Sequence, residues 1–222
     1  MPYAYVGSAA NASNGNTVTY SPTAGNFLLI ISSTSSGGGS PTFTVADNSG
    51  STYTVDVAAT ADANNQWNGF AHCASVLSGV TTVTITYNGG TPGSAYIGVV
   101  EYSGISTSSP YQGISAINHQ ASPGTGANAV TSNAFSNTSQ PAAIIGISID
   151  IFGNGPAWTA GTGYTLRAQL NSAIAVEDLR ATSNASQTAT FTTTHGTTTF
   201  DTYVLAFTEA ASGGTLLGQI WT

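Results

Sequence analysis

Charged side chains are rare in this chain, and three of them fall close together in one predicted hairpin. Arg167 lies in a stretch of alternating polar and apolar residues, and Glu177 and Asp178 follow the turn signal Asn171-Ser172. If the hairpin is centred on Ser172, Arg167 lies opposite Glu177, and such a cross-strand pair contributes about 0.2–1 kcal/mol. The three charges could form a polar binding site or structural ion pairs. We favour ion pairs, because the chain has almost no other cations.

Both strands of this hairpin alternate with period two, and in the first strand this pattern predicts a single buried face. In the first strand, the side chains expected on one face are Tyr164, Leu166, Ala168 and Leu170. In the second strand, one face is expected to carry Ile174, Val176 and Asp178, and the other Ala175, Glu177 and Leu179.

Glu101, Glu177 and Asp178 are candidates for the paired carboxylates of a glycosidase. Such enzymes hold two carboxyl groups about 5–9.5 Å apart across the scissile bond. However, no strand has the E-x-D-x-E spacing that would place several carboxylates on one face. The carboxylates therefore do not predict a hydrolase.

The histidines His72, His119 and His195 could each serve a Ser-His-Asp arrangement, but no G-x-S-x-G elbow is present. His72 lies in an apolar strand and is expected to be a core histidine with a hydrogen-bond partner. The other two lie beside turn residues and are expected to be exposed. We therefore predict that the protein is not an enzyme.

Metal and cofactor sites are not predicted. Asp47, Asn48 and Asp56, or Asp62 and Asn64, could supply oxygen ligands for Ca²⁺, but neither group matches a known calcium loop. Asn and Asp in turns usually form Asx-turns instead. The histidines and the single cysteine show no zinc spacing, and the glycine-rich segment at 37–40 precedes a strand rather than a helix, so it is not a phosphate loop.

A carbohydrate site is the best candidate for a ligand site, because sugars bind to an aromatic platform flanked by amide and carboxylate groups. Asn64, Asn65, Gln66, Trp67 and Asn68 have this composition. The structural alternative is that Trp67 only closes one end of the core, and we favour that alternative.

The composition excludes two classes of partner. The chain has 222 residues, two cations, nine acidic residues and a net charge of −7, and it contains no lysine. Binding of nucleic acid or of an anionic membrane needs clustered Lys and Arg, so neither partner is expected. The surface must be covered by Ser, Thr, Asn and Gly, as is common in proteins outside cells or on virus particles.

The first residues, MPYAYVGSAANAS, lack the basic and apolar regions of a signal peptide, and no apolar run is long enough to span a membrane. Cys73 is the only cysteine, so no intrachain disulfide is possible. A protein that looks extracellular but shows no signal peptide fits a phage structural protein released by lysis, and a trimmed secreted domain is the alternative.

The chain predicts an all-β fold. About thirteen short strands alternate with turn signals, no segment has a helical period, and no repeat of fixed period is evident. Phe27–Ser32 is a continuous apolar run, and it and Ala142–Phe152 are expected to be strands buried on both faces. We expect a β-sandwich domain over residues 1–210, followed at 211–222 by a linker and an apolar tail. The apolar residues of the tail, which could dock on this domain or on a neighbouring subunit, are Leu216, Leu217, Ile220 and Trp221.

The order of several segments resembles a group of β-sandwich modules found in bacterial secreted proteins and phage structural proteins. The segments are GNFLLIIS, VADNSGSTYTV, TTVTITY, VVEYSGISTSSPYQ, AAIIGISI, AWTAGTGYTLR, AVEDL and YVLAF, within Gly25–Phe207. The resemblance implies a two-sheet antiparallel sandwich of the jelly-roll or concanavalin-like kind, with a surface or adhesive role and no catalytic residues.

Together these observations predict a non-enzymatic protein of the phage virion surface, a capsid decoration or fibre-like protein. Its expected partners are other virion subunits or further copies of itself, and a cell-surface glycan is a further candidate. The alternative is a carbohydrate-binding module of a secreted bacterial protein.

Overall fold

The computed structural model describes residues 2–11, 15–36, 41–61, 65–89, 92–121, 127–150, 157–194 and 199–211. This part of the chain forms nineteen strands, arranged in antiparallel sheets that do not close into a barrel, so the predicted all-β class is confirmed. The strands outnumber the predicted thirteen because several are only two to four residues long, too short for a period-two pattern to reveal. None of the described residues belongs to a helix able to cross a membrane.

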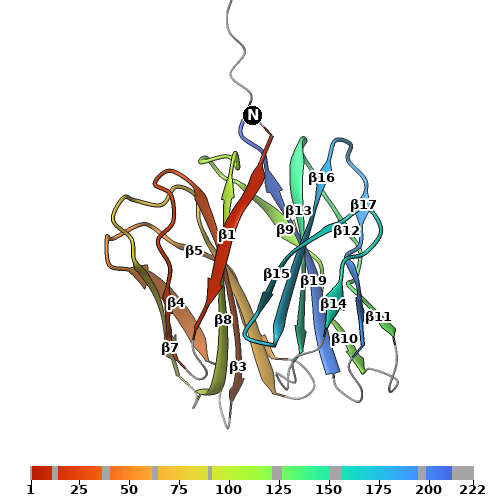
Figure 1. Cartoon of the computed structure of the whole chain (residues 1–222), viewed down its shortest axis with the longest axis horizontal. Helices are drawn as coiled ribbons and strands as arrows, with labels where there is room; N and C mark the ends of the chain where they lie inside the picture. The colour runs from red at the N-terminus through yellow and green to blue at the C-terminus, as the bar shows by residue number, and fades with distance from the viewer. Residues whose placement is uncertain are drawn as a thin grey trace, which may run out of the picture.

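The first half of the chain forms a main sheet and a smaller outer sheet, on the left of Figure 1. The main sheet has the order β1 (Ala4–Ala10), β8 (Pro92–Ser103), β3 (Phe27–Ser36), β6 (Gln66–Cys73) and β5 (Thr54–Ala61). The outer sheet has the order β2 (Thr17–Thr19), β7 (Thr82–Asn88) and β4 (Thr42–Asp47). The successive strands β4 and β5 therefore lie in different sheets.

The second half also forms a main sheet and an outer sheet. In the main sheet, β9 (Tyr111–Ile114) and β10 (Asn118–Ala121) both pair with β19 (Thr199–Thr208), followed by β13 (Ala142–Asp150), β16 (Ile174–Ala181) and β15 (Thr165–Leu170). The outer sheet has the order β11 (Asn128–Thr131), β18 (Thr190–Thr193) and β14 (Trp158–Thr159). A separate pair is formed by β12 (Phe135–Ser136) and β17 (Ser186–Gln187).

The two halves have the same topology. If β9 and β10 together take the place of β1, each strand of the first main sheet and outer sheet has a counterpart, in the same chain order and the same sheet position. We call residues 4–103 the first repeat and residues 111–208 the second repeat. The repeat has little sequence signal, because the connecting loops differ in length and equivalent positions are not at a fixed spacing.

Irregularities in the first edge strand recur at the equivalent place. In β1 the pairing with β8 shifts by one residue between Tyr5 and Gly7, and Tyr5 pairs with Tyr102. In β9, one extra residue likewise separates Tyr111 from Gly113, and Tyr111 pairs with Phe207. A bulge is a specific local feature rather than a defect, so its recurrence supports residue-level equivalence of the repeats.

A second bulge recurs at the opposite edge. Asp56 of β5 is the extra residue opposite β6, and Arg167 of β15 is the extra residue opposite β16. Two residues before each bulge, a threonine pairs with His72 in the first repeat and with Asp178 in the second. Thus Asp56 is equivalent to Arg167, and His72 to Asp178.

The bulge at Arg167 overturns the prediction of a single buried face in β15. An extra residue reverses the side-chain alternation that follows it. Tyr164 and Leu166 therefore pack on the outer side of the main sheet, whereas Ala168 and Leu170 pack on its inner side. The alternation predicted for β16 is confirmed, with Ile174 and Val176 on the inner side.

The two main sheets share one apolar core, which we call the inter-repeat core. Both central strands alternate regularly, so every second side chain enters this core, as predicted for strands buried on both faces. Its principal members are Phe27, Leu29, Ile31, Phe70, Val100 and Tyr102 from the first repeat, and Ile145, Ile147, Ile149, Ile174, Val176, Leu205 and Phe207 from the second. These side chains are at most 1% exposed.

Each outer sheet covers the other face of its main sheet. In the first repeat Leu28 and Ile30 of β3 pack with Val83 and Ile85 of β7. In the second repeat Trp158 of β14 packs with side chains of β18 and β19. The described chain therefore has three apolar layers, and the middle one belongs to both repeats.

We expect truncation of the inter-repeat core to destabilise both repeats together. Leu29→Ala should lower the free energy of unfolding by about 2–5 kcal/mol, as for other fully buried leucines. Urea unfolding followed by fluorescence and circular dichroism should show one shifted transition. Val55→Ala is the control, because Val55 is 38% exposed. Two separate transitions would contradict the shared core.

Candidate functional site

The carboxylate of Glu177 is fully buried and receives two backbone hydrogen bonds. The amide of Gly161 donates to Oε2 at 2.8 Å, and the amide of Thr190 donates to Oε1 at 3.1 Å. Gly146 on the neighbouring strand leaves room for this side chain, since a Cβ there would lie 2.8 Å from the Glu177 Cγ. Glu177 therefore connects the main sheet to the loop before β15 and to the outer sheet.

Burial also sets the protonation of this group. The pKa of Glu177 is raised to about 7, mainly by loss of hydration; the two backbone hydrogen bonds oppose this rise, and the nearby charge of Asp178 adds to it. An elevated pKa in a cleft can mark a catalytic acid. Here the carboxyl is 0% exposed and already bound on both oxygens, so its role is structural.

The ion pair of this hairpin joins Arg167 to Asp178, not to Glu177. Arg167 Nε donates to Asp178 Oδ2 at 2.9 Å, and the carboxylate is 2% exposed. The predicted cross-strand partner was wrong because the bulge places Arg167 between two paired positions. The guanidinium also lies over the Tyr5 ring, 5.8 Å from its centroid, which joins β15 to β1 of the other repeat.

Glu101, the remaining carboxylate candidate, is 1% exposed. It accepts hydrogen bonds from the Tyr20 hydroxyl at 2.6 Å, the Thr23 amide at 3.0 Å and the Asn26 side chain at 2.5 Å. These donors come from the loop between β2 and β3. Glu101 thus fixes a loop, and it lies in a different repeat from Glu177.

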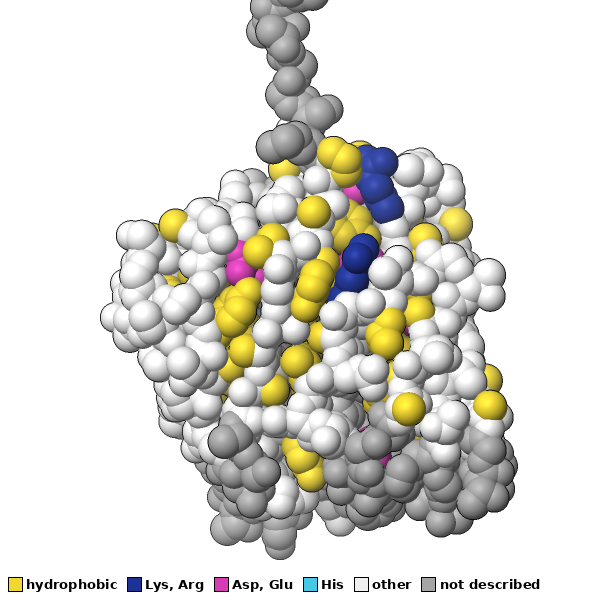
Figure 2. Space-filling view, viewed as in Figure 1, with side chains coloured by type: hydrophobic (Ala, Val, Ile, Leu, Met, Phe, Trp, Pro, Cys, Tyr) yellow, Lys and Arg dark blue, Asp and Glu magenta, His cyan; other side chains and the backbone are white. Residues whose placement is uncertain are grey.

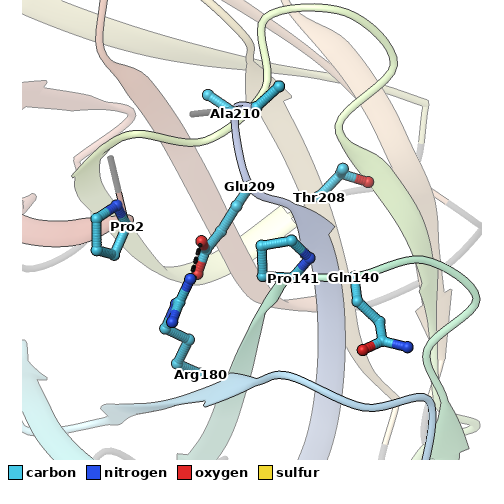
Figure 3. A pocket seen from close by; sticks show the side chains of 8 residues that line it. Pro2, Gln140, Pro141, Arg180, Thr208, Glu209 and Ala210 are labelled. Carbon is cyan, nitrogen blue, oxygen red and sulfur yellow. Dashed lines mark hydrogen bonds and ion pairs between the residues drawn. The ribbon is translucent and has the colours of Figure 1, made fainter. Parts of the chain in front are cut away.

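The second arginine lies beside a surface hollow, shown in Figure 3. Arg180 binds Glu209 through two hydrogen bonds, Nε to Oε1 at 2.5 Å and Nη2 to Oε2 at 2.8 Å. The hollow has a volume of about 490 Å³ and is also lined by Pro2 and Pro141. Since both oxygens of this carboxylate are already bound, the described lining residues supply no free acid or base.

The residues of the predicted carbohydrate site lie on both faces of β6. Trp67 is half-buried on the outer face, whereas Gln66 and Asn68 are buried on the inner face. Asn65 is exposed and has a φ of 58°, and Asn64 lies outside the described residues. The structure therefore does not bring Trp67 and Asn68 to one surface.

The histidines occupy two different environments. His72 is 6% exposed and its Nδ1 lies 2.8 Å from Asp56, so the predicted core histidine with a partner is confirmed. Its ring stacks on Phe27, and it lines a polar hollow together with Tyr111. His119 was expected to be exposed but pairs with the buried Asp201 at 2.7 Å, with 28% of its side chain exposed. His195 lies outside the described residues.

Asn68 of the first repeat also binds Asp201, so that His119, Asp201 and Asn68 form one polar cluster between the repeats. Asn68 Nδ2 donates to Asp201 Oδ2 at 2.5 Å and to the Tyr203 hydroxyl at 3.2 Å. We did not predict this cluster. The available signal was Asp201 itself, a charged residue at the start of an otherwise apolar strand.

The remaining candidates are explained or lie outside the structure. Asp47 accepts hydrogen bonds from the amides of Ser49 and Ser51, an Asx-type turn. Within the described residues, no three His, Cys, Asp or Glu side chains are grouped to hold a metal ion. The whole predicted assembly tail, Leu216, Leu217, Ile220 and Trp221, falls outside the described residues.

Comparison with family models, curated proteins and solved structures finds no match for this chain.

The raised pKa of Glu177 predicts a specific pH dependence of stability. Because the folded state holds this proton more tightly than the unfolded chain, the contribution is complete below about pH 4.5. It is lost as the pH rises through about 7. We expect the free energy of unfolding to fall by roughly 1–3 kcal/mol over this window.

Urea titrations at several pH values should be made on the wild type and on Glu177→Gln. The variant is expected to be less stable, since its amide N–H₂ opposes a backbone N–H, and to lack this part of the slope. Parallel pH profiles of the two proteins would contradict the assignment.

Proposed function

We propose that this chain is a non-enzymatic structural protein of the phage virion surface, a capsid decoration or fibre-like protein. In this proposal each repeat is a small sandwich of the jelly-roll or concanavalin-like kind. The observation that favours it most is that the carboxylates Glu101, Glu177 and Asp178 all accept structural hydrogen bonds or ion pairs within the fold. All three are buried and bound to groups that hold loops and strands together, which is expected of a scaffold rather than of a hydrolase.

The surface composition also supports this role. The chain has no lysine and only two arginines. On the face drawn in Figure 2, neutral polar side chains and backbone cover most of the surface, and the cationic side chains form two small patches. Among the described residues, the large apolar side chains that are exposed are scattered: Val6, Val55 and Leu77. Contacts with other subunits are therefore assigned to the apolar tail beyond the described domain.

Removal of the tail tests this assignment. Deletion of Thr215–Thr222 should abolish self-assembly or particle binding, because it removes Leu216, Leu217, Ile220 and Trp221, four large apolar side chains. The oligomeric state is measured by light scattering, and particle binding by co-sedimentation. A full-length variant with these four residues changed to serine controls for chain length and should behave like the deletion. An unchanged oligomeric state together with unchanged particle binding would reject the proposal.

Carbohydrate binding remains the second candidate. It is favoured by the partly exposed Trp67 and the exposed Asn65, which adjoin at the beginning of β6. An aromatic ring next to an amide is a common sugar platform, although Asn68 cannot contribute from the inner face.

A glycan array tests this second function directly. The wild-type protein should bind at least one glycan, and Trp67→Ala should weaken that binding at least tenfold. Leu77→Ala serves as the control, since it removes an exposed apolar side chain outside this group. Absence of binding to every glycan, or equal binding by the Trp67 variant, would exclude the candidate.

A further inference from the structure

A polar hollow of about 400 Å³ lies beside His72, at the junction of the two repeats. The first repeat contributes Asp56 and His72, the second contributes Tyr111, and the linker at residues 104–110 contributes Thr107 and Ser109. We call this the His72 hollow. Its volume falls within the range of roughly 300–1,000 Å³ that is usual for ligand sites.

One edge of the His72 ring opens into this hollow. The Asp56 carboxylate lies 2.8 Å from Nδ1, and the ring stacks on Phe27 with centroids 5.6 Å apart. The described residues make no hydrogen bond to Nε2, and Nε2 is not among their sealed polar atoms that lack a partner, so it reaches the surface. His72 is 6% exposed, and the surface that it reaches belongs to this hollow and to a smaller one that adjoins it.

The free position at Nε2 suits a hydroxyl group. The Asp56 carboxylate requires a proton on Nδ1 and thereby fixes the orientation of the ring. Nε2 accepts a hydrogen bond when the ring is neutral and donates one when it is charged, and a hydroxyl can pair with either form. In a Ser-His-Asp triad a hydroxyl of the chain itself occupies this position. None of the described hydroxyls does so here, which leaves the position to a ligand.

The walls of the His72 hollow suit a ring that carries several hydroxyls. Tyr111 is half-buried, with its ring centroid 5.8 Å from that of Phe207, and it lines the hollow. The rim includes the exposed residues Thr107 and Ser109. Ser109 has a φ of 46°, and such strained backbone often lies at ligand sites. An aromatic side chain beside a few fixed polar groups is a combination that binds sugars.

The second repeat fills the equivalent place with its own side chain. Tyr5 is equivalent to Tyr111, and Arg167 is equivalent to Asp56. At the edge between β1 and β15, the Arg167 guanidinium lies over the Tyr5 ring. At the edge between β5 and β9, the shorter Asp56 binds His72 instead, and a hollow lies beside Tyr111. The chain thus covers one tyrosine with a cation and leaves space beside the other.

We propose that the His72 hollow binds a neutral saccharide, which packs on Tyr111 and places one hydroxyl against Nε2 of His72. Its lining contains no Lys or Arg to pair with an acidic sugar, and the net charge of −7 repels anions. The proposal assigns a second site to the carbohydrate-binding candidate, and it depends neither on Trp67 nor on the virion role.

A glycan array that carries neutral and sialylated glycans tests this site with the full-length protein. At least one neutral glycan should bind, and its affinity is then measured by calorimetric titration. Ala74→Phe places a ring in the hollow but retains His72 and Asp56, so it should weaken this binding by about tenfold or more. Ala46→Phe is the matched control and should bind as the wild type does, because Ala46 is exposed and does not line the hollow.

His72→Asn separates the roles of the two ring nitrogens. The amide of asparagine can still donate to Asp56, but it has no group at the place of Nε2. Binding should again fall by about tenfold or more, with an unchanged circular dichroism spectrum, whereas Trp67→Ala should leave it unchanged. Absence of neutral glycan binding, a preference for sialylated glycans, or unchanged binding by Ala74→Phe would overturn the proposal. Loss of binding in Trp67→Ala alone would also overturn it, and would assign the glycan to the group around Trp67.

Discussion

The apolar core between the two main sheets is the interaction on which the rest of the structure depends. Each main sheet buries one face against its own outer sheet, but its inner face is covered only by the other repeat. Neither repeat can exclude water from side chains such as Leu29 and Ile147 by itself. The repeats must therefore fold as one body, although each has a complete set of strands.

The charged residues act within this constraint, because few of them reach solvent freely. Glu101 and Glu177 attach loops to the outer faces of the main sheets, and the pairs Asp56–His72 and Arg167–Asp178 mark the same bulge in the two repeats with different chemistry. Asp56 and Arg167 thus occupy the same backbone bulge but carry opposite charges. At the equivalent positions Asn68 and Ile174 both the side chain and the backbone pairing differ, because β5 has a further register shift between Val57 and Thr60 that β15 lacks.

Local sequence patterns predicted the central strands β3 and β13, the alternation of β16 and the turn at Asn171–Ser172, because each depends on neighbours in sequence. The turn has left-handed φ values at both positions, 49° and 56°. What depends on pairing between distant strands was not predictable. The bulge at Arg167 changed its ion-pair partner from Glu177 to Asp178, and the faces of β6 separated Trp67 from Asn68. The repeat was not predicted, because the two repeats share their strand order but differ in loop lengths and side chains.

Hydrogen exchange under native conditions tests most directly whether the inter-repeat core makes one cooperative unit. The backbone amides of β3 and β13 lie at the centres of the two main sheets and report on separate repeats. If the account is correct, the slowest amides of both strands exchange only by global unfolding, with the same free energy and the same dependence on denaturant. A lower opening free energy confined to one of the two strands would show that the repeats unfold independently and would contradict the account.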